Sequence, residues 1–547
     1  MMQFHRGKNG GCLEMTHLKV VGSFCAASAL AALLFVFLEL ATGPCAEQNG
    51  LYNFRESLYL SSLKDSLTFT SQSQEKNASG IITCSTSQAA QLSSSGKVCH
   101  REWEKPSVIK EREWEKFWDE NTPEVQRTFT PVGVSAFLFI KFGAYRLSPN
   151  NFSIVGLSPK ALHNFGNPGY ECFWTPKSGD PIYAIEGNAT GYLPGIKYAN
   201  QYVGTVVHCQ FDRDVGADQT GGSLKVVAKM GSWDMTGLQD AQFVALEEKP
   251  GEYDGSLFKE PFKYDFMYCG SPLYGKISPQ RVREWIAWHA RILGPRSHFI
   301  LYDGGGLHDD VRKVLAPWVK LGRVSIMNYR QEARYDSHYH SQAVVLNDCL
   351  MQAKTLAEWA LFFDIDEYLY VPSNVSLAAV MKKIKEEKGR GAQQVTFRQR
   401  PMNPSHCVKR PANDSDESFQ RQWGIEKLVY QRTQVTERGG WMDHKYAVQT
   451  KYILVAGTHD HEASFVPEGK SNWKETIFFE WKDRVHYHHF HNTINIREEL
   501  CKEFVDPWVK ETKFNNVTHF YDESLSKLAD AVRQFELETV GSQPFIL

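Results

Sequence analysis

Three carboxylates follow a short apolar run in the middle of the chain, within the stretch WALFFDIDEYLYVP at Trp359–Pro372. Leu361–Phe363 has the character of a parallel strand buried on both faces, and Asp364, Asp366 and Glu367 come directly after it. Ligands of an open α/β sheet bind at the carboxyl ends of its strands, and alternation points Asp364 and Asp366 the same way. Two such charges need a counter-cation, and a divalent metal is the natural one. The alternative is a solvated acidic turn, although the aromatic flanks argue against full solvation.

Four histidines close to the C-terminal end form the most unusual cluster in the chain: His486, His488, His489 and His491. On a strand, His489 and His491 share one face while the other two share the opposite face. An imidazole nitrogen suits Mn²⁺ as a third ligand beside two carboxylates. The alternative interpretation is a surface cluster without a function.

The composition limits the classes of protein to which the chain can belong. Its 547 residues are too many for one ordinary domain, so we expect two folded units with additional tails. Lys and Arg number 61 against 63 Asp and Glu, which predicts no nucleic-acid partner. The 14 Trp and 23 Tyr exceed what a core needs, and aromatic planes of this kind also bind sugar rings.

An apolar run at Val20–Leu38 follows a basic segment that contains Arg6, Lys8 and Lys19. About 20 apolar residues span a bilayer, and the positive flank stays in the cytosol. We therefore predict a cytoplasmic tail at 1–19 and a transmembrane signal anchor at 20–41, with a cleavable signal peptide as the rival. Six Asn-x-Ser/Thr sequons support a lumenal location for the rest, at Asn77, Asn151, Asn188, Asn374, Asn413 and Asn516.

Nine of the 11 cysteines follow the predicted anchor, where the lumen would allow disulfides. Plausible pairs are Cys84 with Cys99, Cys172 with Cys209, and Cys407 with Cys501. Spacing alone does not determine the connectivity. An odd number leaves one cysteine over, either free or bridging two subunits, which is compatible with a homodimer.

Three further segments can be separated by their patterns. Residues 42–127 are rich in Ser, Gln, Lys and Glu and predict a stem. Residues 128–258 contain short β-like runs with turn signals, which predicts an all-β sandwich, a module that in lumenal proteins often binds carbohydrate. Residues 259–547 begin with alternating strands and helices, which predicts an α/β domain with a mostly parallel sheet.

The strand ends of this α/β domain should face one crevice. They are Gly270–Tyr274, Tyr302–Gly306 and Asp364–Glu367. Asp303, at the close of the second strand, is placed to accept hydrogen bonds from a uracil or ribose hydroxyl. The glycines after it would admit close backbone approach.

Five segments in order, CGSPLYG, LYDGGG, NDCL, FFDIDEYLYVP and HYHHFHN, resemble glycosyltransferase family 92 and, within it, the plant galactan synthases. The resemblance covers roughly Lys263–Glu538, and the β-rich region before it resembles the carbohydrate-binding module of those enzymes. It implies the GT-A fold of nucleotide-sugar transferases. It also implies transfer of galactose from UDP-galactose, with inversion, to the 4-hydroxyl of β-1,4-galactan in pectin side chains, by a type II protein of the Golgi membrane.

The resemblance also implies roles for individual residues. Asp364 would contact the donor ribose or the metal, Asp366 would be the main ligand of Mn²⁺, and His489 would complete the metal site ahead of His491. Lys445 resembles a basic residue that suits a diphosphate oxygen.

Inversion needs a base on the acceptor hydroxyl and an electrophile on the departing UDP. Asp443, after Gly439–Met442, is the first candidate for the base, and Glu462 is its rival. Trp423, Trp441 and Trp473 are candidates to stack on acceptor sugars, with core packing as the alternative.

Other functions remain to be weighed against this one. A glycoside hydrolase needs its carboxylates about 5–10 Å apart across a bond, and residues two apart on one strand end are too close. A lumenal carbohydrate-binding protein without transferase activity would need neither the acidic motif nor the histidines. UDP-arabinopyranose is an alternative donor, because a pocket discriminates the missing hydroxymethyl group by only about 1–3 kcal/mol.

Overall fold

The computed structural model describes residues 82–84, 99–101, 124–133, 137–160, 168–177, 184–195, 201–229, 240–335, 337–372, 375–388, 392–409, 422–432, 444–464, 476–478, 485–495 and 501–543. The chain divides into two compact units, Met1–Trp103 and Glu104–Leu547. In the first unit, β1 (Ile82–Cys84) pairs antiparallel with β2 (Cys99–Arg101), and Cys84 lies opposite Cys99. The predicted tail and membrane anchor lie outside the described residues. No helix within the described ranges is long and apolar enough to cross a membrane.

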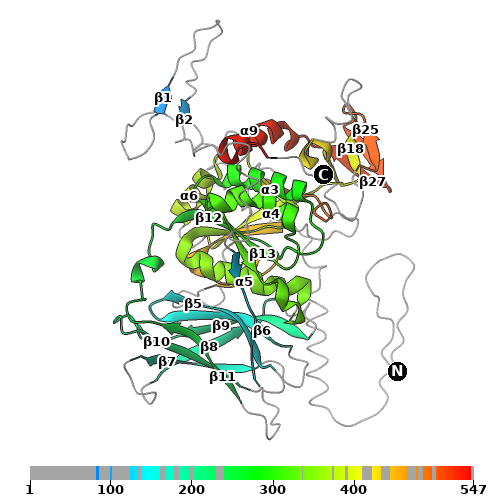
Figure 1. The fold of residues 1–547 in the computed structure, drawn as a ribbon. Coiled ribbons are helices and arrows are strands. Elements are labelled where there is room, and N and C mark those ends of the chain that lie inside the picture. The colour runs from blue at the N-terminus through cyan, green and yellow to red at the C-terminus, as the bar shows by residue number, and fades with distance from the viewer. Residues whose placement is uncertain are drawn as a thin grey trace, which may run out of the picture. The chain divides into compact units, whose positions relative to one another are not determined.

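The second unit contains an α/β domain built on one large sheet (Figure 1). Its first half is parallel, in the order β15-β12-β13-β14-β3. These strands are β3 (Glu124–Gln126), β12 (Tyr264–Cys269), β13 (Ser297–Asp303), β14 (Val324–Asn328) and β15 (Ala357–Phe362). The connecting helices are α3 (Pro279–Leu293), α4 (Asp309–Lys320) and α5 (His338–Leu356). The predicted β-α-β order is present, but β3 extends the sheet with residues that the sequence had assigned to the stem.

The second half of the sheet continues from β15 with mixed pairing, in the order β20-β17-β24-β16. The strands are β16 (Glu367–Tyr370), β17 (Gln394–Pro401), β20 (His444–Gln449), β23 (Thr476–Phe478), which pairs with β17, and β24 (His486–His489). This half brings the predicted histidine cluster onto the strand next to the acidic tip.

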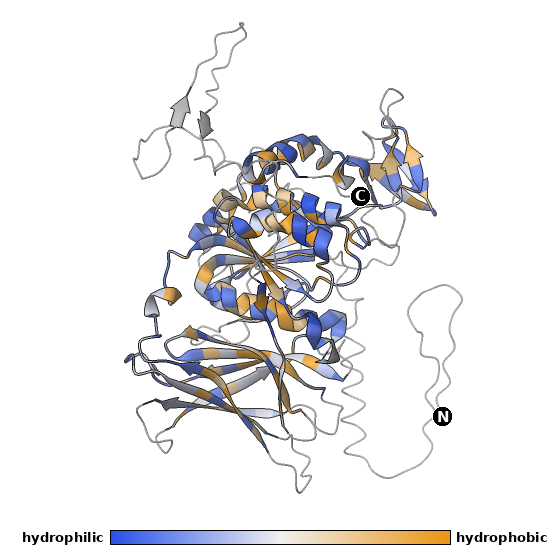
Figure 2. Ribbon diagram, viewed as in Figure 1, coloured by the Kyte–Doolittle hydropathy of each residue, from blue (hydrophilic) through white to orange (hydrophobic). Residues whose placement is uncertain are grey.

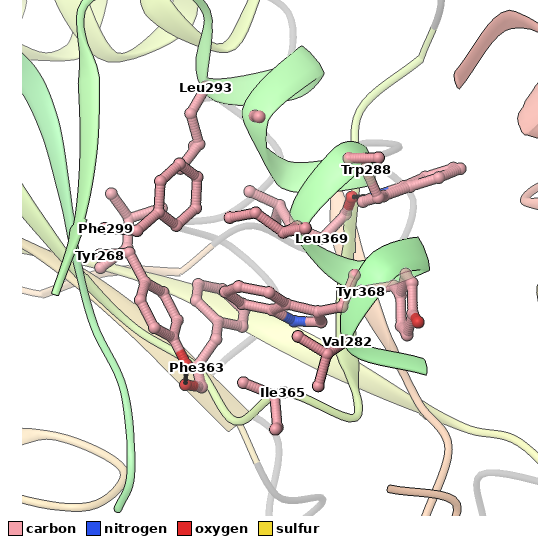
Figure 3. Packing of buried hydrophobic residues seen from close by; sticks show 14 of the residues in the cluster. Tyr268, Val282, Trp288, Leu293, Phe299, Phe363, Ile365, Tyr368 and Leu369 are labelled. Carbon is pink, nitrogen blue, oxygen red and sulfur yellow. Dashed lines mark hydrogen bonds between the residues drawn. The ribbon is translucent and has the colours of Figure 1, made fainter. Parts of the chain in front are cut away.

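Helix α3 covers β16 and thereby fixes the strand that follows the acidic tip. Ser278 caps α3 by accepting from the Arg281 N–H, and Pro279 is the first helical residue. The buried indoles of Trp285 and Trp288 donate to the backbone carbonyls of Glu367 and Leu369, at 3.0 and 2.8 Å. Figure 3 shows Trp288, Tyr368 and Leu369 packed in the same core.

The α/β domain also contains smaller elements. They are α6 (Leu377–Lys388), β18 (His406–Val408), α8 (Gly424–Lys427), β19 (Tyr430–Arg432), β21 (Ile453–Ala456), β22 (His461–Ser464), β25 (Glu503–Val505), β26 (Glu511–Phe514), β27 (Val517–Tyr521) and α9 (Ala529–Val540). Among them, β18 pairs with β25, β21 pairs with β22, and β27 lies between β19 and β26.

A β-rich module precedes the α/β domain and has a core of its own. Eight strands form one antiparallel sheet in the order β11-β10-β7-β8-β9-β6-β5-β4. They are β4 (Thr130–Val132), β5 (Phe139–Ser148), β6 (Asn151–Pro159), β7 (Gly169–Pro176), β8 (Ile185–Tyr192), β9 (Tyr202–Gln210), β10 (Gly222–Lys229) and β11 (Ala241–Glu248). These strands carry both hydrophobic and hydrophilic residues (Figure 2), and along β10 buried residues alternate with partly buried ones. Buried Phe152 and Trp174 stack in the module's core, so Trp174 is closed to ligands.

Three disulfides lie in the described residues. Cys172–Cys209 and Cys407–Cys501 confirm two predicted pairs. The third, Cys269–Cys349, was not predicted, and it ties the end of β12 to α5. Cys84 and Cys99 face each other in register, and their bond stays a prediction.

Helix α5 lies between the module and the sheet of the α/β domain (Figure 1), and one hydrophobic core includes residues of both. Asp348 of α5 is fully buried. One of its carboxylate oxygens, Oδ1, accepts a hydrogen bond from Arg127. The same oxygen accepts from the Tyr145 hydroxyl of the module at 2.5 Å. The other accepts from Tyr302 of β13 at 2.7 Å and from Gln352 at 3.0 Å. The module is therefore joined to the α/β domain through a buried charge.

We predict that Asp348→Ala destabilises the whole second unit. The variant leaves the Arg127 charge and two tyrosine hydroxyls without their acceptor, which costs about 3–5 kcal/mol in the free energy of unfolding. Chemical denaturation followed by fluorescence measures it. Asp310→Ala is the control, because Asp310 forms an exposed ion pair with Lys313 on α4 and its loss should change stability by less than about 1 kcal/mol. Equal effects of the two variants would contradict this role for Asp348.

Candidate active site

The three predicted strand ends meet at one edge of the sheet. Leu273 pairs with Asp303, and its carbonyl accepts from the N–H groups of Gly304 and Gly306 at 2.8 and 3.0 Å. A Cβ on Gly306 would lie 2.6 Å from the Tyr274 nitrogen, so only glycine allows this approach. The ends of β12 and β13 are thus locked together beside the end of β15.

The acidic tip is a closed turn between β15 and β16. The Glu367 N–H donates to the Asp364 carbonyl at 3.1 Å, and the Asp364 N–H donates to the Glu367 carboxylate at 2.8 Å. Glu367 is completely buried, whereas the side chains of Asp364 and Asp366 keep 30% and 14% of their surface exposed. The solvated-turn alternative therefore fails for Glu367, and the two aspartates are the groups that a ligand can reach.

Strand β24 brings one histidine to this turn. In its antiparallel pairing with β16, His489 lies opposite Glu367, and the Phe490 N–H donates to the Asp366 carbonyl at 2.9 Å. The His489 Nε2 lies 3.5 Å from Asp366 Oδ1, and its Nδ1 lies 3.4 Å from Glu367 Oε1. The His491 ring is 3.5 Å from that of His489, between ring centres. His489 and His491 are thus grouped as the sequence pattern predicted.

The other two histidines of the cluster face away from the tip. His488 is buried against Asp522 and Ser524, with its Nε2 3.2 Å from a polar atom of each. His486 packs against the Tyr370 ring at 4.8 Å.

A buried lysine lies among the carboxylates. Lys445 of β20 is 3% exposed, and its Nζ lies 2.8 Å from Asp364 Oδ2 and 3.5 Å from Glu367 Oε2. Burial opposes ionisation of Asp364, but Lys445 and the Ser271 hydroxyl outweigh it and lower the pKa of Asp364 to about 2. Burial raises the pKa of Glu367 to about 8, although Lys445 acts in the opposite direction. The predicted counter-charge is thus supplied in part by the protein itself.

The same carboxylates also influence the charge on the neighbouring imidazole of His489. Burial disfavours a charged His489, but the Asp366 and Glu367 carboxylates outweigh it and raise the pKa of His489 above its usual value. The carboxylates of the tip therefore favour a positive charge on His489.

The acidic tip offers oxygen and nitrogen donors to a divalent metal. Within the described ranges, no group of three His, Cys, Asp or Glu side chains is already arranged to hold one. However, Glu367 Oε1 and His489 Nδ1 are buried without a hydrogen-bond partner. Two aspartate carboxylates and one imidazole are also ligands that suit Mn²⁺. The residue types fit such an ion, with Asp366 and His489 as the pair already in contact.

Comparison with known proteins identifies the family. The sequence model of glycosyltransferase family 92 matches residues 264–535. Galactan beta-1,4-galactosyltransferase GALS1 of Arabidopsis thaliana is 37% identical over 419 residues, which cover 76% of this chain and 79% of that protein. GALS3 of the same plant is 36% identical over 77% of this chain and 79% of its own length. The chain belongs to glycosyltransferase family 92.

A solved galactosyltransferase, LgtC with donor and acceptor sugar analogues, aligns with 34% of this chain and 58% of its own, at 12% identity. Its TM-score of 0.18 is too low to support an argument. As a family 92 protein, the chain is a glycosyltransferase, and the acidic tip is its candidate active site.

Two residues that the sequence assigned to ligands have other roles in this family 92 domain. Asp303 is fully buried, and it accepts from the Gly305 and Leu307 N–H groups at one oxygen and from Arg312 and Arg330 at the other. The structure therefore does not support donor binding by its side chain, which instead shapes the glycine turn. Trp423 is 2% exposed beside α8, so its assignment to acceptor stacking is wrong and core packing is correct.

The remaining assignments stay predictions. Asp443, Trp441 and Trp473 lie outside the described residues. Glu462 is exposed on β22, where its carboxylate accepts from the Gly195 N–H of the β module at 3.1 Å. Sequence reasoning noted Glu367 but gave it no role, and it missed Ser271, although Ser271 lies inside the motif CGSPLYG.

We predict that Glu367→Gln lowers kcat/KM for sugar transfer about 10–100-fold above pH 8, because the raised pKa of Glu367 leaves its carboxyl largely ionised only in that range. The amide can still accept from the Asp364 N–H, but it cannot take on the negative charge that the ionised carboxylate presents to Lys445 and His489, and groups that orient a ligating imidazole typically have effects of this size. Steady-state kinetics measures it, with Glu538→Gln on exposed α9 as the matched control. Unchanged kinetics of Glu367→Gln would show that the buried charge has no part in transfer.

Proposed function

We propose that the protein is an inverting galactosyltransferase that moves galactose from UDP-galactose to the 4-hydroxyl of a terminal β-galactose on β-1,4-galactan. The observation that carries this proposal is the convergence of Asp364, Asp366 and His489 in a chain whose relatives are named galactan beta-1,4-galactosyltransferases. The parallel half of the sheet, with the tip at its carboxyl edge, is consistent with a GT-A arrangement.

Each of the site residues would have its own role in donor binding or transfer. Asp366 and His489 would hold Mn²⁺, with Asp364 as the second carboxylate or as the contact to the ribose. When bound, the ion supplies positive charge to the departing diphosphate. Lys445 fixes the Asp364 carboxylate at 2.8 Å and adds a second positive charge beside it. Asp443 or Glu462 would take the proton from the acceptor hydroxyl, as inversion requires.

The β module would bind the galactan chain outside the transfer site. The module packs against α5 of the α/β domain, and this packing would hold a bound acceptor at a constant distance from the tip. The contact of Glu462 with Gly195 places a module loop next to a candidate base. Fixed positioning of this kind lowers the entropy cost of bringing acceptor and donor together.

We further propose a type II location in the Golgi membrane, with the described residues in the lumen. The disulfides are consistent with an oxidising compartment. Asn188 on β8 and Asn516 in the turn between β26 and β27 are exposed, as sequon asparagines must be for glycosylation. The membrane anchor and a homodimer bridged by an odd cysteine complete this proposal.

Product analysis tests the proposed reaction. The purified protein is incubated with a panel of UDP-sugars, Mn²⁺ and short β-1,4-galacto-oligosaccharides, and the products are weighed by mass spectrometry. We expect addition of hexose from UDP-galactose, its loss on chelation with EDTA, and its return with added Mn²⁺. Addition of pentose alone would assign UDP-arabinopyranose as the donor, and no product with any donor would favour a carbohydrate-binding protein.

A single substitution separates transfer from binding. We expect Asp366→Ala to abolish transfer, because it removes the main metal ligand, and to leave galactan binding by the β module intact. Transfer is measured with UDP-galactose, and binding by affinity electrophoresis in galactan gels. Asp530→Ala, an exposed change on α9, is the control. Loss of both functions in Asp366→Ala would contradict separate sites.

A further inference from the structure

Both oxygens of the Asp364 carboxylate are held by the protein. Oδ2 accepts from Lys445 Nζ at 2.8 Å, and Oδ1 accepts from the Ser271 hydroxyl. The Ser271 oxygen accepts in turn from Gln342 Nε2 at 2.6 Å. Gln342 is 8% exposed and lies at the start of the right-handed part of α5. The chain of contacts Gln342–Ser271–Asp364 therefore links the helix to the acidic tip.

This chain of hydrogen bonds has one possible direction. A serine hydroxyl carries a single proton, and a carboxylate can only accept. Because Gln342 donates its amide to the Ser271 oxygen, the Ser271 proton is left for Asp364. The Thr458 hydroxyl donates to Gln342 Oε1 at 3.4 Å, which is compatible with this direction. The Asp364 carboxylate thus requires Ser271 as a donor, and the Gln342 amide N–H binds the Ser271 oxygen without competing for that proton.

The backbone before Gln342 is in a rare conformation, which determines the position of the Gln342 Cα atom. Tyr339, His340 and Ser341 have φ of 47°, 53° and 63°, a left-handed turn that non-glycine residues seldom adopt. Two contacts hold the turn: Tyr329 donates its hydroxyl to the His340 carbonyl at 2.8 Å, and the Tyr274 ring lies 3.9 Å from that of His340. A strained backbone that several surrounding contacts hold in place is typical of functional sites.

Further along α5, two more contacts prevent the helix from shifting. Cys349 is bonded to Cys269 at the end of β12, and the Asn347 side chain bonds both the N–H and the carbonyl of Ala456 at 2.8 Å. The position of Gln342 relative to the strand ends is therefore set from both sides.

We propose that Gln342 is a positioning residue for donor binding, which acts by directing the Ser271 hydroxyl onto Asp364 so that this carboxylate keeps one orientation toward a nucleoside diphosphate and its divalent cation. The inference rests on the proposed function, because it needs a nucleotide-sugar donor at the acidic tip. It adds two residues, Gln342 and Ser271, that would determine the affinity for the donor without contacting it.

The test is the isosteric variant Gln342→Glu, which reverses the hydrogen bond. A carboxylate at this position accepts the hydrogen bond of the Ser271 hydroxyl, so Ser271 can no longer donate to Asp364. We expect the dissociation constant for UDP in the presence of Mn²⁺, measured by calorimetry on the full chain, to rise about tenfold or more. The KM for UDP-galactose should rise in parallel while the KM for the oligosaccharide acceptor is unchanged.

Matched variants separate this role from a structural one. Gln534→Glu makes the same chemical change on the exposed face of α9 and should bind UDP as the wild type does. Ser271→Thr keeps the hydroxyl and should also retain affinity, whereas Ser271→Ala should weaken UDP binding to the same extent as Gln342→Ala. This serine pair serves as the test if Gln342→Glu does not fold.

Wild-type affinity in Gln342→Glu, or equal affinities in Ser271→Thr and Ser271→Ala, would overturn the inference while the proposed function stands. A wild-type protein that binds no UDP with Mn²⁺ would instead overturn the proposed function, and the inference with it.

Discussion

The structure depends on the compensation of negative charge at the end of a buried strand. Asp364, Asp366 and Glu367 are held within one turn, and Glu367 is completely out of contact with water. Such a group of carboxyl groups is tolerated only when cations and hydrogen-bond donors face it. Lys445 and His489 supply part of that compensation from β20 and β24. Both strands reach the tip because the second half of the sheet continues from β15 through β20 and β17 to β24 and β16.

Helix α5 links the other parts of the molecule to this turn. Its first turns carry Gln342, its middle is bonded to β12 through Cys349, and Asp348 receives donors from the module and from β13. The β module is thus not a separate domain on a flexible linker, because it shares a hydrophobic core with the catalytic sheet. Any shift of the module would be transmitted to α5 and from there to the strand ends.

The two corrected assignments have a common cause. Asp303 follows a strand and Trp423 follows a charged segment, and both residue types are frequent in sugar-binding sites. Yet Asp303 is surrounded by backbone N–H groups and two arginines, and Trp423 is covered by the packing around α8. Polar and aromatic side chains stabilise cores as well as ligands, and a one-dimensional pattern contains no information about which side of a turn faces the solvent.

The sequence by itself determined the alternation of strands and helices and the acidic tip after β15, because both follow from local periodicity. It offered two of the disulfides as plausible pairs, and the structure confirmed them. Only the tertiary structure decided that His489 lies opposite Glu367, that Lys445 enters the carboxylate cluster, and that Cys269 bonds to Cys349. These contacts join segments about 80 residues apart or more, and they depend on strand register and burial. Local propensity cannot determine such contacts, because it acts over only a few neighbouring residues.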